Sequence, residues 1–178
     1  MNRIFFGVDP SFRAFGVVVY DSDLDEIIAC HTFRTAKQSK KRRIYVADDD
    51  ARRLADVTKG YHELLLLHNP DLIFSETPSG GALSHKAAKG MAYATALTTI
   101  IPLITGHTVV HITAKDSKKA STGKVNGSKA EVEQAVKIRF PGAPFHPSIK
   151  VINEHQHDAA SVLMAGMLTP HWAIATRP

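Results

Sequence analysis

The feature that most constrains this chain is a short apolar run near its start that ends in an acid. Residues 4–8 read Ile-Phe-Phe-Gly-Val, and Asp9 and Pro10 close the run. A second apolar run, residues 15–20, follows after a short connection. Runs of this length that are rich in β-branched and aromatic residues and bounded by turn residues predict buried strands. The short spacing predicts that the two strands pair as an antiparallel hairpin.

The presence of an acid, Asp9, at the end of the first strand needs an explanation. A carboxylate at the end of a central strand is costly to bury unless a cation meets it. One interpretation is a turn-forming or capping role, which Asp often has. The other is a metal ligand, which requires that further carboxylates converge on the same place.

The rest of the chain alternates between strand and helix patterns. Residues 27–33 predict a third strand that continues an antiparallel meander, and residues 71–76 and 108–112 predict two more. The order helix, strand, helix, strand after the third strand is typical of parallel crossovers. The predicted fold class is therefore α/β, with a five-stranded mixed sheet that has its first strand at the centre and is flanked by helices.

Four helices are expected. Acids at Asp48, Asp49 and Asp50 open the first, and a Ser128–Glu131 capping box opens the third. Small residues fill the second, residues 84–101, which predicts packing on the sheet or, failing that, a helix-to-helix dimer contact. Asn153 is the expected cap of the last helix. The segments predicted without regular structure are a polar, basic loop at 113–127 and the tail at 171–178.

Length and composition restrict the class of protein. A chain of 178 residues suits one domain, 1–178, with a real core. Cys30 is the single cysteine, which excludes an internal disulfide and a cysteine-clustered zinc site. No stretch is expected to span a membrane, and residues 1–4 lack the layout of a signal peptide. These features predict a cytoplasmic protein without membrane contact.

The positive charge is clustered. The net charge is +5, with a pI near 9.4. A solvated surface explains either basic block alone, but two blocks in a chain with inward-facing acids indicate a polyanion held against metal. The residues predicted to bind nucleic acid are Lys37, Lys40, Lys41, Arg42 and Arg43 in the first block and Lys115, Lys119 and Lys124 in the second.

Three places offer metal ligands. Asp9 ends the first strand and Glu76 the fourth, so parallel pairing of these strands would put both acids side by side. His155 and Asp158 are three residues apart and project from one helix face; Glu154 could share that face, whereas His157 is expected at the surface. Oxygen ligands with one imidazole suit Mg²⁺ or Mn²⁺.

Together these motifs resemble the RuvC-type Holliday junction resolvases over nearly the whole chain. The matching segments, in order, are Gly7-Val8-Asp9-Pro10-Ser11 with Gly16, Ser75-Glu76, residues 123–132 and His155-Gln156-His157-Asp158-Ala159. The resemblance implies a ribonuclease H-like domain. It also implies four metal-binding residues, Asp9, Glu76, His155 and Asp158, and lysines that handle the cleaved strand, Lys118 and Lys129.

The function implied by this resemblance is an Mg²⁺- or Mn²⁺-dependent endonuclease. It would resolve Holliday junctions or other branched DNA by two-metal-ion hydrolysis of phosphodiesters, and would act as a homodimer because two strands are cut symmetrically. Two departures from the family pattern point to a divergent branch, such as one of phages or viruses. Ser79 stands where the family usually has a Phe near the junction centre, and the basic block at 37–43 is heavier.

Two other functions remain open from sequence. A nuclease of the same fold could process structured RNA, since the sequence does not separate DNA from RNA shape. A non-catalytic junction-binding protein would keep the basic blocks but would have no need of four aligned ligands. An ATPase of the actin-like class is excluded because it needs two such domains.

Overall fold

The fold is built on one sheet with helices on both faces. A computed structural model describes residues 3–38, 45–77, 84–147 and 149–177. Over these ranges the elements, in chain order, are β1 Ile4–Asp9, β2 Ala14–Asp21, β3 Glu26–Arg34, α1 Val46–His68, β4 Leu72–Thr77, α2 His85–Ile104, β5 Val109–Thr113, α3 Ala114–Thr122, α4 Lys129–Arg139, α5 Lys150–Gly166 and α6 Pro170–Ala175.

The sheet has the predicted composition and centre. Its strand order is β3-β2-β1-β4-β5. β1 pairs antiparallel with β2 and parallel with β4, and β5 adds in parallel beside β4. In this register Val8 lies opposite Ser75, so the next residues, Asp9 and Glu76, lie at adjacent strand ends. The prediction of a five-stranded mixed sheet with a central first strand is confirmed.

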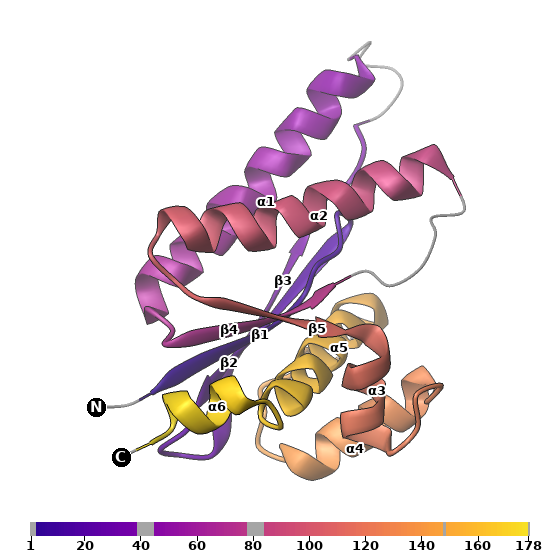
Figure 1. Cartoon of the computed structure of the whole chain (residues 1–178). Coiled ribbons are helices and arrows are strands. Elements are labelled where there is room, and N and C mark those ends of the chain that lie inside the picture. Colours follow the sequence, from indigo (N-terminus) through magenta and orange to yellow (C-terminus); the bar gives the residue numbers. More distant parts are fainter. Residues whose placement is uncertain (1–2, 39–44, 78–83, 148, 178) are drawn as a thin grey trace.

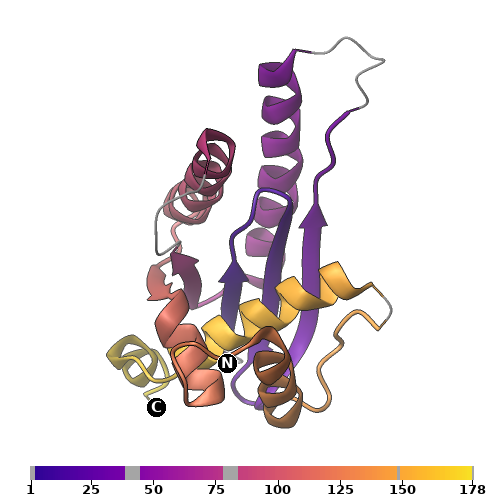
Figure 2. The ribbon, with the colours of Figure 1, turned by 90° about the vertical axis from the view of Figure 1, so that its right-hand side faces the viewer.

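Helices cover the two faces unequally. Figure 1 shows α1 and α2 on one face and α3, α4 and α5 on the other, and Figure 2 shows the same layers edge-on. Strand alternation divides the core accordingly. Phe5 and Phe74 pack with α4 and α5, whereas Phe6 and Ile73 pack with α1 and α2. Gly7 and Asp9 follow Phe5 at intervals of two, so both belong to the α5 face.

Three predictions about regular structure are wrong. The expected loop at 113–127 contains helix α3, which Thr113 caps by accepting a hydrogen bond from the Asp116 amide. Helix α5 begins at Lys150, before the expected cap Asn153. The expected irregular tail contains α6, whose start is capped by Thr169 and whose Trp172 ring packs on Phe5 at 4.4 Å between centroids.

Helix α2 is more apolar than we expected from the sequence. Its segment Ala87–Ile104 is long and apolar enough to cross a membrane by length and composition, with a mean hydropathy of 1.3. The expectation that no stretch meets this test is therefore wrong. Only 28% of that segment is buried, because α2 packs chiefly on α1 and, in the sheet, on β5. Its exposed apolar side chains include Ile100, Leu103 and Ile104.

Candidate metal centre

Two glycines let helix α5 lie very close to the sheet. A Cβ added at Gly7 would lie 2.3 Å from the carbonyl oxygen of Ala159, and one at Gly16 would lie 2.3 Å from that of His155. Contacts this short do not occur for real Cβ atoms, so any side chain at either position would push the helix away. Gly16 is also the pairing partner of Asp9. The glycines therefore bring the helix turn that carries His155 against the end of β1.

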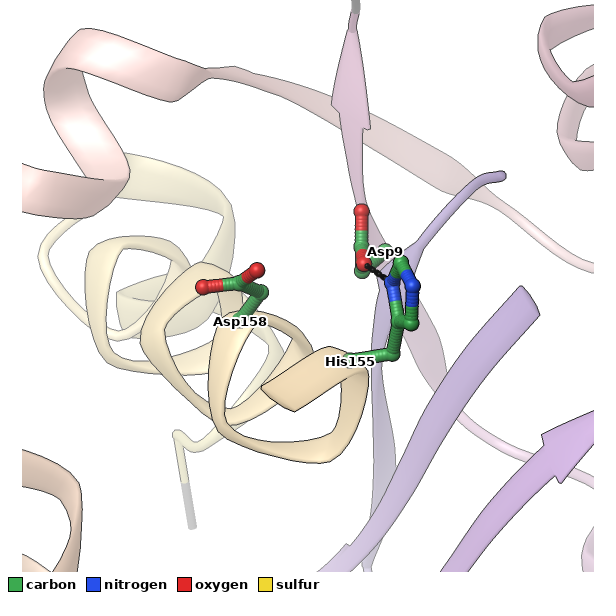
Figure 3. Close-up of side chains that lie close together, drawn as sticks. All are labelled: Asp9, His155 and Asp158. Carbon is green, nitrogen blue, oxygen red and sulfur yellow. Dashed lines mark hydrogen bonds and ion pairs between the residues drawn. The ribbon is translucent and has the colours of Figure 1, made fainter. Parts of the chain in front are cut away.

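This close packing brings together three candidate metal ligands from distant parts of the chain. One ligand atom each from Asp9, His155 and Asp158 can be chosen so that all lie within 4.8 Å of one another. Figure 3 shows the two α5 side chains beside Asp9, with His155 Nδ1 2.5 Å from Asp9 Oδ2. The side chains are only 14% (Asp9), 19% (His155) and 27% (Asp158) exposed. The group is thus shielded but open to solvent on one side.

Glu76 borders this group but is not among the three clustered residues. It lies at the end of β4, on the same side of the sheet as Asp9. Burial, and then the charges of Asp9 and Asp158, raise the pKa of Glu76 to about 7. The electrostatic coupling places Glu76 near both acids, as the parallel pairing of β1 and β4 predicts.

The acids repel one another at this end of the sheet. Burial, followed by the charge of Asp9, raises the pKa of Asp158 to about 6. A bound cation would stabilise the charged form of carboxylates whose pKa values are raised in this way. The donors available are carboxylate oxygens and one imidazole nitrogen, which suit Mg²⁺ or Mn²⁺. The residues present therefore fit a divalent metal.

Two lysines act on the acids from neighbouring helices. Lys118 on α3 and Lys129 on α4 both lower the pKa values of Glu76 and Asp158. Lys129 forms an ion pair with Glu154, and its Nζ lies 3.9 Å from Asp158 Oδ2. The structure therefore places both predicted lysines at the edge of the acidic group, and it directs Glu154 to Lys129 rather than into the three-residue cluster.

Helix α3, which was not predicted from the sequence, is held against α5 by hydrogen bonds between hydroxyl groups. The Ser161 hydroxyl lies 2.8 Å from the Ser117 hydroxyl and donates to the Ser117 carbonyl oxygen at 2.9 Å. Ser117 precedes Lys118, and Ser161 lies one turn after Asp158. This contact ties the helix that carries Lys118 to the helix that carries Asp158. Thr113 and Asp116, spaced as in a capping box, are the sequence signal that could have revealed α3.

The residues predicted to bind nucleic acid differ in exposure and in their ion pairs. Lys37, Lys115 and Lys119 are exposed. Lys124 is exposed but paired with Glu131, with 2.7 Å between Nζ and Oε1. The positions that fall outside the described residues are Lys40, Lys41, Arg42, Arg43 and Ser79.

His157 is not at the surface, contrary to expectation. It is 3% exposed, and its ring packs edge-on against Phe145 at 4.6 Å between centroids. Burial lowers the pKa of His157. Because α5 begins earlier than predicted and lies on the sheet, His157 is enclosed while His155 and Asp158 face the end of β1.

Comparison with known proteins gives a structural match alone. No protein-family model matches the chain, and no curated protein matches it. A solved structure described as T. thermophilus RuvC in complex with Holliday junction substrate superimposes with a TM-score of 0.69 over 92% of both chains. The fold is that of RuvC. Sequence identity is 17% to this structure, and a second Thermus thermophilus RuvC structure gives a TM-score of 0.67 at 16% identity, over 91% of this chain and 92% of that one. The ribonuclease H-like fold predicted from the motifs is thereby confirmed.

Proposed function

We propose that this chain is a divalent-metal-dependent endonuclease that resolves four-way DNA junctions. The observation that carries the proposal is the convergence of Asp9, His155 and Asp158 at one end of the sheet, within 4.8 Å. The RuvC fold supports it, since a similar structure was solved with a Holliday junction substrate at TM-score 0.69.

The four predicted ligands would hold two Mg²⁺ or Mn²⁺ ions: Asp9, Glu76, His155 and Asp158. When bound, such ions activate a water for in-line attack on the phosphodiester and stabilise the leaving 3′ oxygen. The carboxylates bind metal in their deprotonated form, which Lys118 and Lys129 favour at Glu76 and Asp158. The same lysines can neutralise charge on the phosphate as it is attacked.

Exposed cations on α3 and after β3 supply the rest of the proposed DNA surface. Lys115 and Lys119 lie on α3 with Lys118, and Lys37 follows β3. Contacts of this kind are made to phosphates, so they hold the DNA without reading its bases. Binding should therefore weaken steeply as salt rises.

A homodimer is the second part of the proposal. Helix α2 exposes Ile100 and Leu103, and a shallow hollow beside them is lined by the small side chains Ala92 and Ala96. Small residues let a second helix come close, and larger exposed apolar patches mark contact sites. We assign this face to a second copy of the chain, which would give two metal centres for two symmetric cuts. Light scattering that finds only monomers under cleavage conditions would contradict this assignment.

One experiment separates the candidate functions. Labelled four-way junction, replication fork and RNA hairpin are incubated with the protein, each with and without Mg²⁺. Metal-dependent cutting of the junction, with both strands cut, is the expected result. Preferred cutting of the RNA hairpin would replace the proposal with RNA processing. Tight junction binding without any cutting in Mg²⁺ or Mn²⁺ would replace it with a non-catalytic junction-binding role.

A further inference from the structure

The turn that follows Asp9 carries an aromatic ring that meets a ring from α2. Phe12 lies three residues after Asp9, and its ring centroid lies 5.3 Å from that of Tyr93 in an edge-to-face arrangement. Figure 2 shows this turn, between β1 and β2, at the same end of the sheet as the first residues of α1. Phe12 and Tyr93 are both partly exposed. Two aromatic side chains are thus available close to the metal ligands.

Contacts from Thr35 and from the buried Arg53 hold Phe12 in place. The Phe12 carbonyl oxygen accepts hydrogen bonds from Thr35 Oγ1 at 2.6 Å and from Arg53 Nη2 at 3.4 Å. The Arg53 guanidinium carbon lies 4.2 Å from the ring centroid, and Arg53 is only 4% exposed. A buried cation against the ring and two bonds to its backbone fix the turn before any ligand arrives. Preorganisation of this kind reduces the entropy lost on binding.

Two exposed cations lie beside the ring pair, one by contact and one by sequence. Lys89 Nζ lies 5.5 Å from the Tyr93 ring centroid and 2.8 Å from Asp50 Oδ2, and its side chain is 44% exposed. Arg13, next to Phe12, is also exposed. A purely structural role accounts for the contact between the turn and α2. It does not account for two exposed cations beside partly exposed rings, which is the composition of surfaces that bind single-stranded nucleic acid.

The ring pair also complements the lysines across the site. Lys118 and Lys129 reach the acids from α3 and α4, on the α5 face. Phe12 and Tyr93 are joined to α1 and α2, on the other face. A DNA strand whose phosphate lies at Asp9 can therefore touch the lysines with one flank and the rings with the other.

We infer that Phe12 and Tyr93 form a stacking platform for an unpaired nucleobase at the branch point, with Lys89 and Arg13 contacting the adjoining phosphates. The inference rests on the proposed function and specifies its substrate contact. Stacking on aromatic rings tolerates any base, because every base has a π-face. The platform provides an aromatic surface in a chain that has Ser79 after Glu76, where related resolvases usually carry Phe. It holds open a branch without selecting its sequence.

The test measures stacking directly. A four-way junction that carries 2-aminopurine at the branch point is titrated in EDTA with the wild type, Phe12→Leu and Tyr93→Leu. Phe12→Tyr and Tyr93→Phe keep a ring, and Phe145→Leu is a matched aromatic loss in the other core. We expect both ring-removing variants to bind about tenfold more weakly or worse and to lose quenching of the 2-aminopurine emission. The ring-retaining variants and Phe145→Leu should behave as the wild type does.

Cleavage kinetics in Mg²⁺ and an abasic junction complete the test. The ring-removing variants should raise KM with little change in kcat, since the rings bind substrate away from the reacting atoms. Replacing the branch-point nucleotide by an abasic site should weaken wild-type binding about tenfold, a result that needs no variant to fold. Wild-type affinity that is unchanged by the abasic site, or unchanged quenching in both Leu variants, overturns the platform even if junctions are cut. Quenching that depends on the rings in a protein that cuts no junction overturns the proposed function and leaves the platform standing.

Discussion

The two faces of the sheet differ in how closely a helix backbone approaches β1 and β2. On one face, Gly7 and Gly16 let α5 come so close that its carbonyl oxygens occupy the space of a side chain. On the other face, the rings of Phe6, Phe15 and Tyr61 fill the layer between the sheet and α1, and Phe15 and Tyr61 lie 5.1 Å apart between centroids.

This difference matches what each face provides. The α5 face carries the candidate metal ligands, whose positions depend on the close contact between α5 and the two glycines. The opposite face is covered in part by α2, which leaves most of its apolar segment exposed. The candidate metal centre thus lies where a helix backbone contacts the strands directly, and the surface that we assign to a partner lies on an exposed apolar helix.

The largest effect, a loss of cleavage, should come from changing a candidate metal ligand on the α5 face. Asp158→Asn removes a charged metal ligand, so we expect junction cleavage to fall about a thousandfold or more, which corresponds to about 4 kcal/mol of barrier. Junction affinity in EDTA should be unchanged or higher, because loss of negative charge does not weaken phosphate contacts. Gel-based cleavage and anisotropy measure the two quantities. Glu63→Gln, on the exposed side of α1, is the matched control, and cleavage by Asp158→Asn at the wild-type rate would disprove the assignment.

A methyl group at the close contact should have the next largest effect. Gly16→Ala places a Cβ where the His155 carbonyl oxygen lies, and such overpacking costs about 1–3 kcal/mol or more. Urea unfolding should show this loss, and cleavage under folding conditions should fall as well because His155 moves. Gly142→Ala is the control, since a Cβ there meets nothing within 4 Å. Equal stability of the two variants would mean that α5 is not held as tightly as described.

The burial of Glu76 beside other acids predicts a pH-dependent stability of the metal-free protein. Folding raises the pKa of Glu76 from 4.5 to about 7, so the folded state holds this proton more tightly than the unfolded state. That stabilisation is complete below pH 4.5 and is lost as the pH rises through 7. Glu76→Gln lacks this loss, and above neutral pH it should be more stable than the wild type by about 1–3 kcal/mol.

Urea midpoints in EDTA, measured from acid to alkaline pH, test this difference. Glu63→Gln should show no such pH-dependent gain, and Mg²⁺ should reduce the advantage of Glu76→Gln by stabilising the wild type. A stability gain that is constant at every pH would show that the ionisation of Glu76 is not its cause.

The smallest change in stability should come from a substitution on the exposed side of α2. Ile100→Glu on α2 alters a side chain that is 52% exposed, so the free energy of unfolding should change by less than about 0.5 kcal/mol. The dimer should nevertheless separate, and coordinated cutting of both strands should become single nicks. Ile138→Glu on α4, at 73% exposure, is the control. Light scattering decides, and a dimer that persists in Ile100→Glu removes α2 from the interface.

The sequence predicted the parts of this structure that have an apolar period or a turn signal. The five strands and the central place of β1 followed from the apolar runs, and the adjacency of Asp9 and Glu76 followed from the two runs that end in acids. Helix α3 was missed because it is attached through Ser117 and Ser161 hydroxyls, which leave no apolar stripe. The start of α5 was missed because its N-cap, Ile149, makes no side-chain capping bond.

The close approach of α5 could not be predicted either. Glycine in a strand indicates a bulge or a near backbone, but the sequence does not say which element comes near. Gly7 and Gly16 acquire their meaning only when Ala159 and His155 are placed against them. The same applies to Phe12 and Tyr93, whose contact joins a turn to a helix far along the chain.

The long sequence separation within the ligand cluster has a consequence for protein synthesis. Asp9 and His155 are 146 positions apart, so a ribosome makes all five strands of the sheet before the helix with His155 and Asp158 emerges. Until then, β1 carries an acid without the partners needed to hold metal. The proposed nuclease would therefore have no activity while it is still being translated, and it would become active only when α5 docks against the two glycines.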